Sequence, residues 1–475
     1  MVYLSLCHSK KFRLLLLAAL VCAATARGLS HEEAQQLWGA RTRAASAAAA
    51  ARPLRYLTFK NFDANETLRS AAARAGIRVG AALAVAHLQN ASDPLFSRTA
   101  AEEFNLAVAE NECKYWSTEP TRDNFTTSNC SVVVDTMRAA GGAARLHNYA
   151  WAGANPGWLY PKPAYSNATL LGILQNHIAR VGGAFAGQVV QTDVINEPFS
   201  NTAPPNPETH DLYLKPMPPW YPAIRDYIPL ALEAARAADP TSLRYINDYG
   251  AEDLGVKSSL VYNFSRGLVA ASPGLLQGIG LQMHVDVDAY PDPIEVAANM
   301  KRLGELGLKV SVTEMDVRCT PPCGADRLAL QAKIYGDVVE ACLNNSGVCE
   351  GVVTWGVTDA FSWLWDFENP HHEDMQPLLF DVRYGKKPAY YEVLAVLQMA
   401  AERRAAPQAC RDRFLWPFSA ASIWNSPIGA GATYLPAGIY STELPTEIHN
   451  DQVRFQRAKP PAEETRKTTL NTRTP

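Results

Sequence analysis

The chain has 475 residues, of which 47% are hydrophobic and 19% are charged, and its formal net charge is −3. This composition is typical of a globular protein with a large core, and it excludes a fibrous or wholly disordered chain. Because the net charge is slightly negative and no basic block is interleaved with aromatic residues, nucleic acid is not expected as a partner.

The first residues have the layout of a secretory signal peptide. Three basic residues between positions 10 and 13 precede an apolar run at 14–24, and the small-residue signal Ala-Thr-Ala ends at residue 26. The apolar run is short for a bilayer span, and no later stretch is long and apolar enough. We therefore expect residues 1–26 to be removed and the mature protein to be secreted, extracellular or in a cell wall, without a membrane partner.

Secretion permits disulfide bonds, and seven cysteines lie beyond the leader. The expected pairs are Cys319–Cys323, Cys342–Cys349 and Cys113–Cys130, with Cys410 left over. In an oxidising compartment these spacings favour disulfides over a zinc site. Seven Asn-x-Ser/Thr sequons fit a secreted glycoprotein, at Asn65, Asn90, Asn124, Asn129, Asn167, Asn263 and Asn344.

Three regions follow the leader. Residues 27–75 form an Ala-rich extension, either a helix or a linker. Short apolar runs that alternate with helical patterns occupy residues 76–400. Residues 401–475 differ in composition from the middle region. A linker and a partial second module, rich in Pro, Gly, Ser and aromatic residues, come first, and a polar tail that is expected to be disordered follows.

The middle region contains eight candidate strands whose interiors are rich in Val, Ile and Leu, as in parallel strands covered on both faces. They span 77–84, 105–112, 144–151, 189–197, 243–249, 278–284, 309–317 and 351–359. Helical patterns lie between many of them. Eight strand–helix units over about 320 residues predict an α/β fold, a closed (β/α)8 TIM barrel.

Nearly every predicted strand ends in polar or aromatic side chains. These are Glu110 and Asn111, His147 and Trp151, Asn196 and Glu197, Asn247 and Asp248, Gln282 and His284, Glu314 and Asp316, and Trp355. One such strand end needs no functional explanation, but so many together predict a site, because the C-terminal ends of barrel strands form the face on which sites are built.

Two of these residues, Glu197 and Glu314, end the fourth and seventh strands, which lie across the mouth of such a barrel from one another. Two carboxyl groups that flank a bound sugar are what acetal hydrolysis requires. One must be protonated to supply the leaving oxygen, and the other must be ionised to attack the anomeric carbon.

The motifs around these glutamates resemble those of glycoside hydrolase family 10, the endo-β-1,4-xylanases. DVINEP at 193–198 and TEMD at 313–316 are similar to the acid/base and nucleophile motifs of that family. Further similar motifs are AENECKYWSTEP (109–120), RLHNYAW (145–151), INDY (246–249), GIGLQMH (278–284) and VVTWGVTDAFSWL (352–364). The resemblance covers about residues 76–400.

The resemblance implies that Glu197 is the general acid/base and Glu314 the nucleophile of a retaining double displacement. The carboxyl groups are then expected about 5–5.5 Å apart, not the about 6.5–9.5 Å of inverting enzymes. Asn196 is implied as the partner of the sugar 2-hydroxyl. His284 is implied to bridge Glu314 and Asp316, which lie two positions apart and so share one face of a strand.

The remaining implied residues bind substrate. Glu110, Asn111 and Lys114 correspond to contacts on the non-reducing side, unless they form only a surface ion-pair cluster. His147 and Gln282 correspond to contacts at the cleavage point, and Trp355 and Trp363 to aromatic walls for sugar rings, the alternative being core tryptophans. Tyr249 is placed on the leaving-group side or in packing, and Trp151 either lines the site or touches substrate.

The sequence departs from the family pattern at Leu146, Ala152, Tyr115, Cys113 and Thr192. None of these changes removes a carboxylate or its immediate partner. Ala152 and Tyr115 bear on subsite affinity and on the preferred chain length.

The sequence therefore predicts a secreted, monomeric endo-1,4-β-xylanase that acts on xylan or a related β-1,4-linked polysaccharide. A non-catalytic glycan-binding wall protein, and a β-1,4-glucanase or transglycosylase on the same barrel, are the alternatives. A metal site at His147 and His284 is disfavoured by the lack of compact ligand spacing, so no metal or cofactor is expected.

Overall fold

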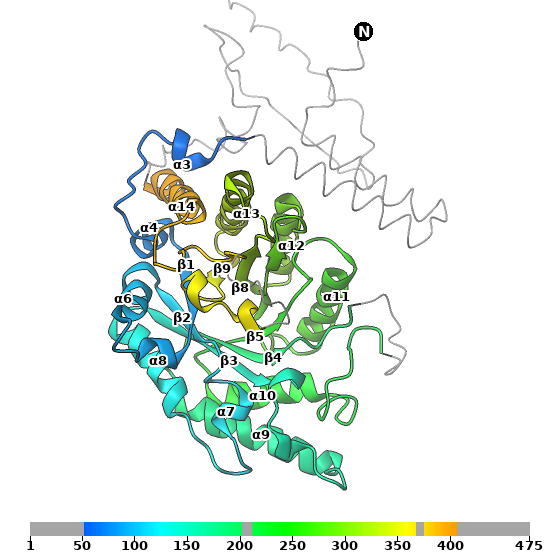
Figure 1. Ribbon diagram of the computed structural model, residues 1–475. Helices are drawn as coiled ribbons and strands as arrows, with labels where there is room; N and C mark the ends of the chain where they lie inside the picture. The colour runs from blue at the N-terminus through cyan, green and yellow to red at the C-terminus, as the bar shows by residue number, and fades with distance from the viewer. Residues whose placement is uncertain (1–51, 202–210, 367–374, 406–475) are drawn as a thin grey trace, which may run out of the picture. The chain divides into compact units, whose positions relative to one another are not determined.

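The computed structural model describes residues 52–201, 211–366 and 375–405 (Figure 1). The predicted signal peptide, the Ala-rich centre of the extension and Cys410 lie outside these residues. So does the predicted C-terminal module, apart from residues 401–405, which end helix α14 (Pro388–Ala405). What was expected of the signal peptide, the Ala-rich centre, Cys410 and the C-terminal module therefore stays a prediction.

Eight parallel strands close into a barrel, which confirms the predicted fold class. They are β1 (Arg78–Leu83), β2 (Leu106–Ala109), β3 (Ala143–Ala150), β4 (Gln191–Asn196), β5 (Leu243–Asp248), β6 (Gly278–Leu281), β8 (Lys309–Arg318) and β9 (Cys349–Thr354). Neighbours in the chain are neighbours in the sheet, β9 pairs with β1, and β6 pairs with β8. The barrel is closed because each strand has a partner on both sides.

The strands are surrounded by helices (Figure 1). The longer helices are α4 (Leu68–Ala75), α6 (Pro94–Glu103), α8 (Ser128–Ala139), α9 (Asn167–Ala184), α10 (Tyr227–Ala238), α11 (Val256–Ala271), α12 (Pro293–Glu305), α13 (Ala325–Asn344) and α14. Short helices are α3 (Arg55–Thr58), α5 (Val85–Leu88) and α7 (Tyr115–Thr118). Apolar residues of the helices and of the outward-facing strand positions form one large core. Burial of both strand faces explains their continuous apolar interiors.

Local sequence signals set several helix ends. Ser166 caps α9 by accepting a hydrogen bond from the amide of Thr169 at 3.2 Å, and Asp292 caps α12 just ahead of Pro293. Gly76 ends α4 with a φ of 81°, a left-handed conformation that glycine adopts without steric cost.

The last part of the predicted extension packs against the barrel. In α4, Leu68, Ala71 and Ala72 are fully buried, and α4 and α3 both contact α14. Arg55 forms ion pairs with Asp337 at 2.6 Å and with Glu392 at 2.8 Å. The packed unit therefore begins before residue 76.

The predicted strand at 278–284 is interrupted in the structure. β6 ends at Leu281, and a short strand β7 (His284–Asp286) continues beside β8. Met283, between them, has a φ of 66°, a left-handed conformation that an extended strand cannot contain. The single strand was a wrong prediction, because the apolar pattern gave no sign of this turn.

All three predicted disulfides, Cys113–Cys130, Cys319–Cys323 and Cys342–Cys349, are present, which confirms the pairings. Each joins residues close in the chain, with separations of 17, 4 and 7 positions. In the part of the chain that the structure describes, no helix is both long and apolar enough to cross a membrane.

Candidate active site

A groove of about 1170 Å³ lies at the C-terminal ends of the barrel strands. Predicted site residues that line it are Glu110, Asn111, Lys114, His147, Trp151, Asn196, Glu197, Tyr249, Gln282, His284, Glu314, Trp355 and Trp363. Asp316 does not line the groove but lies directly behind it, fully buried. The structure thus brings together side chains from seven strand ends, as the barrel topology predicts.

Glu197 lies one residue beyond the end of β4, with a φ of 57° that turns the chain out of the strand. Its backbone amide donates to the carbonyl of Asn247 at 2.8 Å. Its carboxylate accepts hydrogen bonds from Trp151 Nε1 at 3.0 Å and from Gln282 Nε2 at 3.2 Å, and Lys215 Nζ lies 4.0 Å away. The side chain is 19% exposed, so solvent reaches it from the groove.

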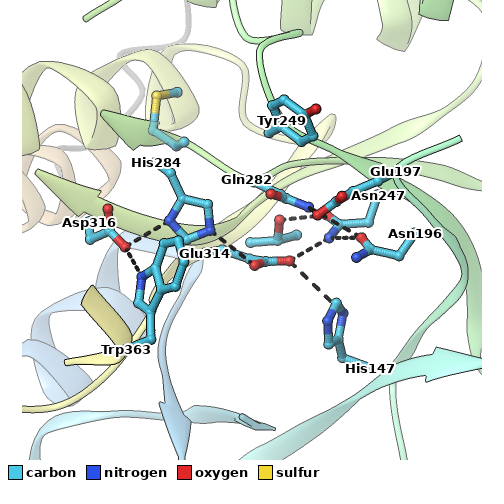
Figure 2. A network of polar contacts seen from close by, with 12 residues as sticks. His147, Asn196, Glu197, Asn247, Tyr249, Gln282, His284, Glu314, Asp316 and Trp363 are labelled. Carbon is cyan, nitrogen blue, oxygen red and sulfur yellow. Dashed lines mark hydrogen bonds and ion pairs between the residues drawn. The ribbon is translucent and has the colours of Figure 1, made fainter. Parts of the chain in front are cut away.

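Glu314 lies within β8 and is more deeply enclosed, with a side chain that is 6% exposed. Oε1 accepts a hydrogen bond from Asn247 Nδ2 at 2.6 Å, and Oε2 accepts one from His284 Nε2 at 3.2 Å (Figure 2). Burial raises the pKa of a carboxyl group, but the charge of His147 and the contacts of His284 outweigh it. The pKa of Glu314 is therefore lowered, and the group is ionised.

His284 connects two carboxylates. Its Nδ1 donates to Asp316 Oδ2 at 2.7 Å and its Nε2 donates to Glu314 Oε2 (Figure 2). Burial disfavours the charged ring, but Asp316 and Glu314 outweigh that cost and raise the pKa of His284 to about 10. At neutral pH the ring is a cation that holds a negative charge on Glu314.

Asn247, at the end of β5, was listed among the polar strand ends, but no role in the site was predicted for it. Its Nδ2 donates to Glu314 Oε1 and, at 2.9 Å, to Asn196 Oδ1. Thr313 donates its hydroxyl to Asn247 Oδ1 at 2.6 Å, which fixes the orientation of the amide. Gly280 makes room, because a Cβ there would lie 2.1 Å from that oxygen. Asn247 therefore aligns both Glu314 and Asn196.

A buried network below the groove supports His147. Its Nδ1 donates to Asp193 Oδ2 at 3.0 Å, and Asp193 also forms a bidentate ion pair with Arg145. Arg145 donates further to Gln191 at 2.8 Å. Burial raises the pKa of Asp193, but the charge of Arg145 outweighs it, and the pKa is lowered. This buried network holds the His147 ring, whose Nδ1 lies 4.0 Å from Glu314 Oε1.

The residues predicted on the non-reducing side form a connected group. Lys114 Nζ donates to Asn111 Oδ1 at 2.9 Å, Asn111 Nδ2 lies 3.4 Å from Glu110 Oε1, and Lys114 lies 5.3 Å from the ring centre of Trp151. Burial lowers the pKa of Lys114, against the opposing charges of the surrounding glutamates. All three residues line the groove, so their assignment to substrate binding stays a prediction that this position favours.

The aromatic residues have distinct positions. Trp355 is buried and lies edge-on to His147, with ring centres 5.3 Å apart. Trp363 lies 5.0 Å from the His284 ring and donates its Nε1 to Asp316 Oδ2 at 2.7 Å. Tyr249 accepts a hydrogen bond from Asn201 at 2.8 Å. Trp363 therefore also holds the Asp316 carboxylate.

Within the described ranges, no group of three or more His, Cys, Asp or Glu side chains is arranged to hold a metal ion. Both ring nitrogens of His284 are already bonded to carboxylates, and Nδ1 of His147 is bonded to Asp193. These contacts leave His284 without a free nitrogen for a ligand role.

A closed barrel that presents one enclosed and one partly exposed glutamate to a shared groove is the arrangement that glycoside hydrolases use. The chain belongs to glycosyl hydrolase family 10, whose sequence profile matches residues 67–396.

Characterised relatives agree with that membership. An endo-1,4-beta-xylanase of Agaricus bisporus is 34% identical over 62% of this chain and 83% of that protein. Endo-1,4-beta-xylanase 2 of Aureobasidium pullulans is 31% identical over 74% of this chain and 94% of its own length. Xylanase 10B of Thermotoga petrophila RKU-1, solved in complex with xylobiose, superposes with a TM-score of 0.65 at 30% identity, over 72% of this chain and 99% of that one.

Proposed function

We propose that the protein is an endo-1,4-β-xylanase that cleaves internal bonds of xylan with retention of configuration. The observation that carries the proposal is the difference between the two groove carboxylates. Glu314 is enclosed and kept ionised by His284, whereas Glu197 is more exposed. A retaining glycosidase needs an ionised nucleophile and a carboxyl group that exchanges a proton.

In the first step Glu314 attacks the anomeric carbon, and Glu197 gives its proton to the departing glycosidic oxygen. The bond from the anomeric carbon to that oxygen breaks as the bond to Glu314 forms. His284 and Asn247 hold both oxygens of Glu314, so that little reorganisation accompanies the attack.

In the second step Glu197, now ionised, takes a proton from a water molecule that attacks the same carbon and releases Glu314. Water reaches Glu197 through the groove because its side chain is partly exposed. Retention then follows from two inversions, and we expect the two carboxyl groups about 5–5.5 Å apart.

Asn196 is assigned to the sugar 2-hydroxyl beside the reacting carbon. Its Oδ1 accepts from Asn247 and Gln282 at 2.9 and 3.3 Å, so its amide nitrogen is left for substrate. A hydrogen bond to that hydroxyl strengthens in the transition state and contributes to rate rather than to binding alone.

Several features support a xylan chain as substrate. The groove, at about 1170 Å³, exceeds the range of about 300–1,000 Å³ typical of small-molecule sites, which suits a polymer. Aromatic rings and hydrogen-bonding side chains both line it, and both are used to bind sugar rings. The relatives named above are xylanases, and one was solved with xylobiose.

We infer that the protein acts outside the cell. Its leader resembles a secretory signal, three disulfides lie in the described residues, and disulfides persist in oxidising compartments.

The decisive experiment follows a defined xylo-oligosaccharide in heavy-oxygen water. Mass spectrometry locates the incorporated oxygen and therefore the cleaved bond, while NMR reports the anomer released first. We expect internal cleavage and the β anomer. The α anomer would overturn retention, absence of products would favour a glycan-binding protein, and faster release from carboxymethyl-cellulose than from xylan would favour a glucanase.

A further inference from the structure

A buried ion pair lies outside the groove, between the end of the barrel and α14. Asp359, at the start of the 3-10 turn Asp359–Phe361, contacts Lys387 Nζ through Oδ2 at 2.8 Å. Their side chains are 1% and 5% exposed, and neither residue lines the groove. Burying two charges costs desolvation free energy, so this ion pair is not expected to be present for stability alone.

The pair connects two stretches of chain. Asp359 Oδ1 accepts a hydrogen bond from the amide of Leu378 at 2.7 Å, and the amide of Asp359 donates to the carbonyl of Phe380 at 2.9 Å. Lys387 Nζ donates to the carbonyl of Gln376. The ion pair therefore fixes the start of the segment that follows β9 against the N-terminal end of α14.

That segment carries Trp363, four residues beyond Asp359. The indole nitrogen of Trp363 donates to Asp316 Oδ2, the same oxygen that accepts Nδ1 of His284, both at 2.7 Å (Figure 2). His284 in turn donates to Glu314. A displaced Trp363 would leave Asp316 with one hydrogen-bond donor fewer. Asp316 would then hold the His284 ring, which orients Glu314, less firmly.

We propose that Asp359 and Lys387 are positioning residues for the hydrolysis: they set Trp363 against Asp316 and so set His284 on Glu314. The inference rests on the proposed function, because it takes Glu314 as the nucleophile. A small displacement of groups far from the reacting atoms is enough to lower a rate about 10²-fold.

The first test is spectroscopic and needs no turnover. The indole N–H signal of Trp363 is assigned in the ¹⁵N-labelled protein by its loss in Trp363→Phe. In Asp359→Asn we expect this signal to move toward that of a water-exposed indole, because the indole N–H no longer donates to Asp316. The matched control is Asp337→Asn, which removes a carboxylate of similar burial (8% exposed) that pairs with Arg55 and does not line the groove. An unmoved signal in Asp359→Asn overturns the proposal.

The second test is a double-mutant cycle on xylan hydrolysis with Asp359→Asn and Trp363→Phe. We expect Asp359→Asn to lower kcat by about 10- to 100-fold, and Asp337→Asn to change it little when both are assayed well below their melting temperatures. The double variant should lose little more than the more damaged single variant, because both act through Asp316. Fully additive losses overturn the proposal.

Two other outcomes, a variant that does not fold and a wild type without activity, also have a defined meaning. If Asp359→Asn does not fold, Lys387→Arg, which keeps the positive charge but changes its geometry, takes its place and is judged by the same two outcomes. If the wild type does not hydrolyse xylan, the proposed function fails, while the Trp363 signal still decides the positioning role.

Discussion

The two sides of the groove treat a glutamate in opposite ways. On the β8 side, Glu314 is enclosed, and donors from Asn247 and His284 hold both of its oxygens. On the β4 side, Glu197 lies beyond the strand end in a left-handed conformation, with the groove open before it. The difference shows how one barrel holds two carboxyl groups in unlike surroundings: position relative to the strand end sets exposure, and neighbouring charges and donors lower the pKa of Glu314 despite its burial.

The largest expected effect is the removal of the enclosed carboxylate. Glu314→Gln keeps the shape of the side chain but cannot attack carbon, so hydrolysis of xylan should fall at least about 10⁴-fold. Reducing-sugar release measures the loss, and near-UV circular dichroism checks the fold. Activity within tenfold of the wild type would remove Glu314 from the role of nucleophile.

The open carboxylate should show a loss that depends on substrate. Glu197→Ala is expected to slow xylan hydrolysis about 10²- to 10⁴-fold, but to spare the bond-breaking step of an aryl xylobioside whose leaving group needs no proton. Steady-state and burst kinetics on both substrates test this. Equal losses on the two substrates would contradict the assignment of Glu197 as the acid.

A smaller effect is expected from the shared amide. Asn247→Ala removes a hydrogen bond to the charged Glu314, a contact worth about 1.5–3 kcal/mol, so kcat should fall about 10- to 100-fold. Asn299→Ala is the control, because Asn299 is equally buried but bonds the backbone carbonyls of Ala251 and Glu252 and the side chain of Arg302, not Glu314 or Asn196. If the two variants lose activity alike, the role of Asn247 is general packing.

The last expected effect is on stability rather than on activity, and it concerns the dependence of stability on pH. The pKa of His284 is about 10 in the folded protein, above the about 6.5 of an unfolded histidine. Its stabilising contribution is therefore complete below about pH 6.5 and is lost as the pH rises through 10, with a slope of at most about 1.4 kcal/mol per pH unit.

Urea unfolding of the wild type and of His284→Gln between pH 6 and 10 measures this contribution. The difference in unfolding free energy between the two proteins should shrink as the pH rises. A difference that stays constant over this range would mean that the His284 ring is not a buried cation.

Much of the site could be predicted because barrel topology converts chain order into spatial order. Once eight parallel strands are recognised, their C-terminal ends must meet on one face, so Glu197 and Glu314 could be paired across 117 positions. The two-residue spacing of Glu314 and Asp316 likewise predicted that both share one face of a strand. The family resemblance, not the spacing, implied that His284 lies between them, and its ring contacts both.

Other features depended on contacts that no local pattern encodes. Asn247 is one polar strand-end residue among many, and only its distance from Glu314 and Asn196 reveals its role. The turn at Met283 interrupts an apolar stretch that reads as one strand. The hydrogen bond from Trp363 to Asp316 gives an expected aromatic wall, which lines the groove, a second role as a support for that carboxylate.

The sequence by itself determined the barrel, the three disulfide pairs and thirteen of the residues that line the groove, because strand periodicity, cysteine spacing and family motifs are properties of the chain order. The tertiary structure alone decided which carboxylate is enclosed and which is open, and how Asn247 and Trp363 hold the groups behind them. Burial and hydrogen-bond partners, which set a carboxyl group's protonation, come from segments distant in the chain, and they exist only once the barrel has closed.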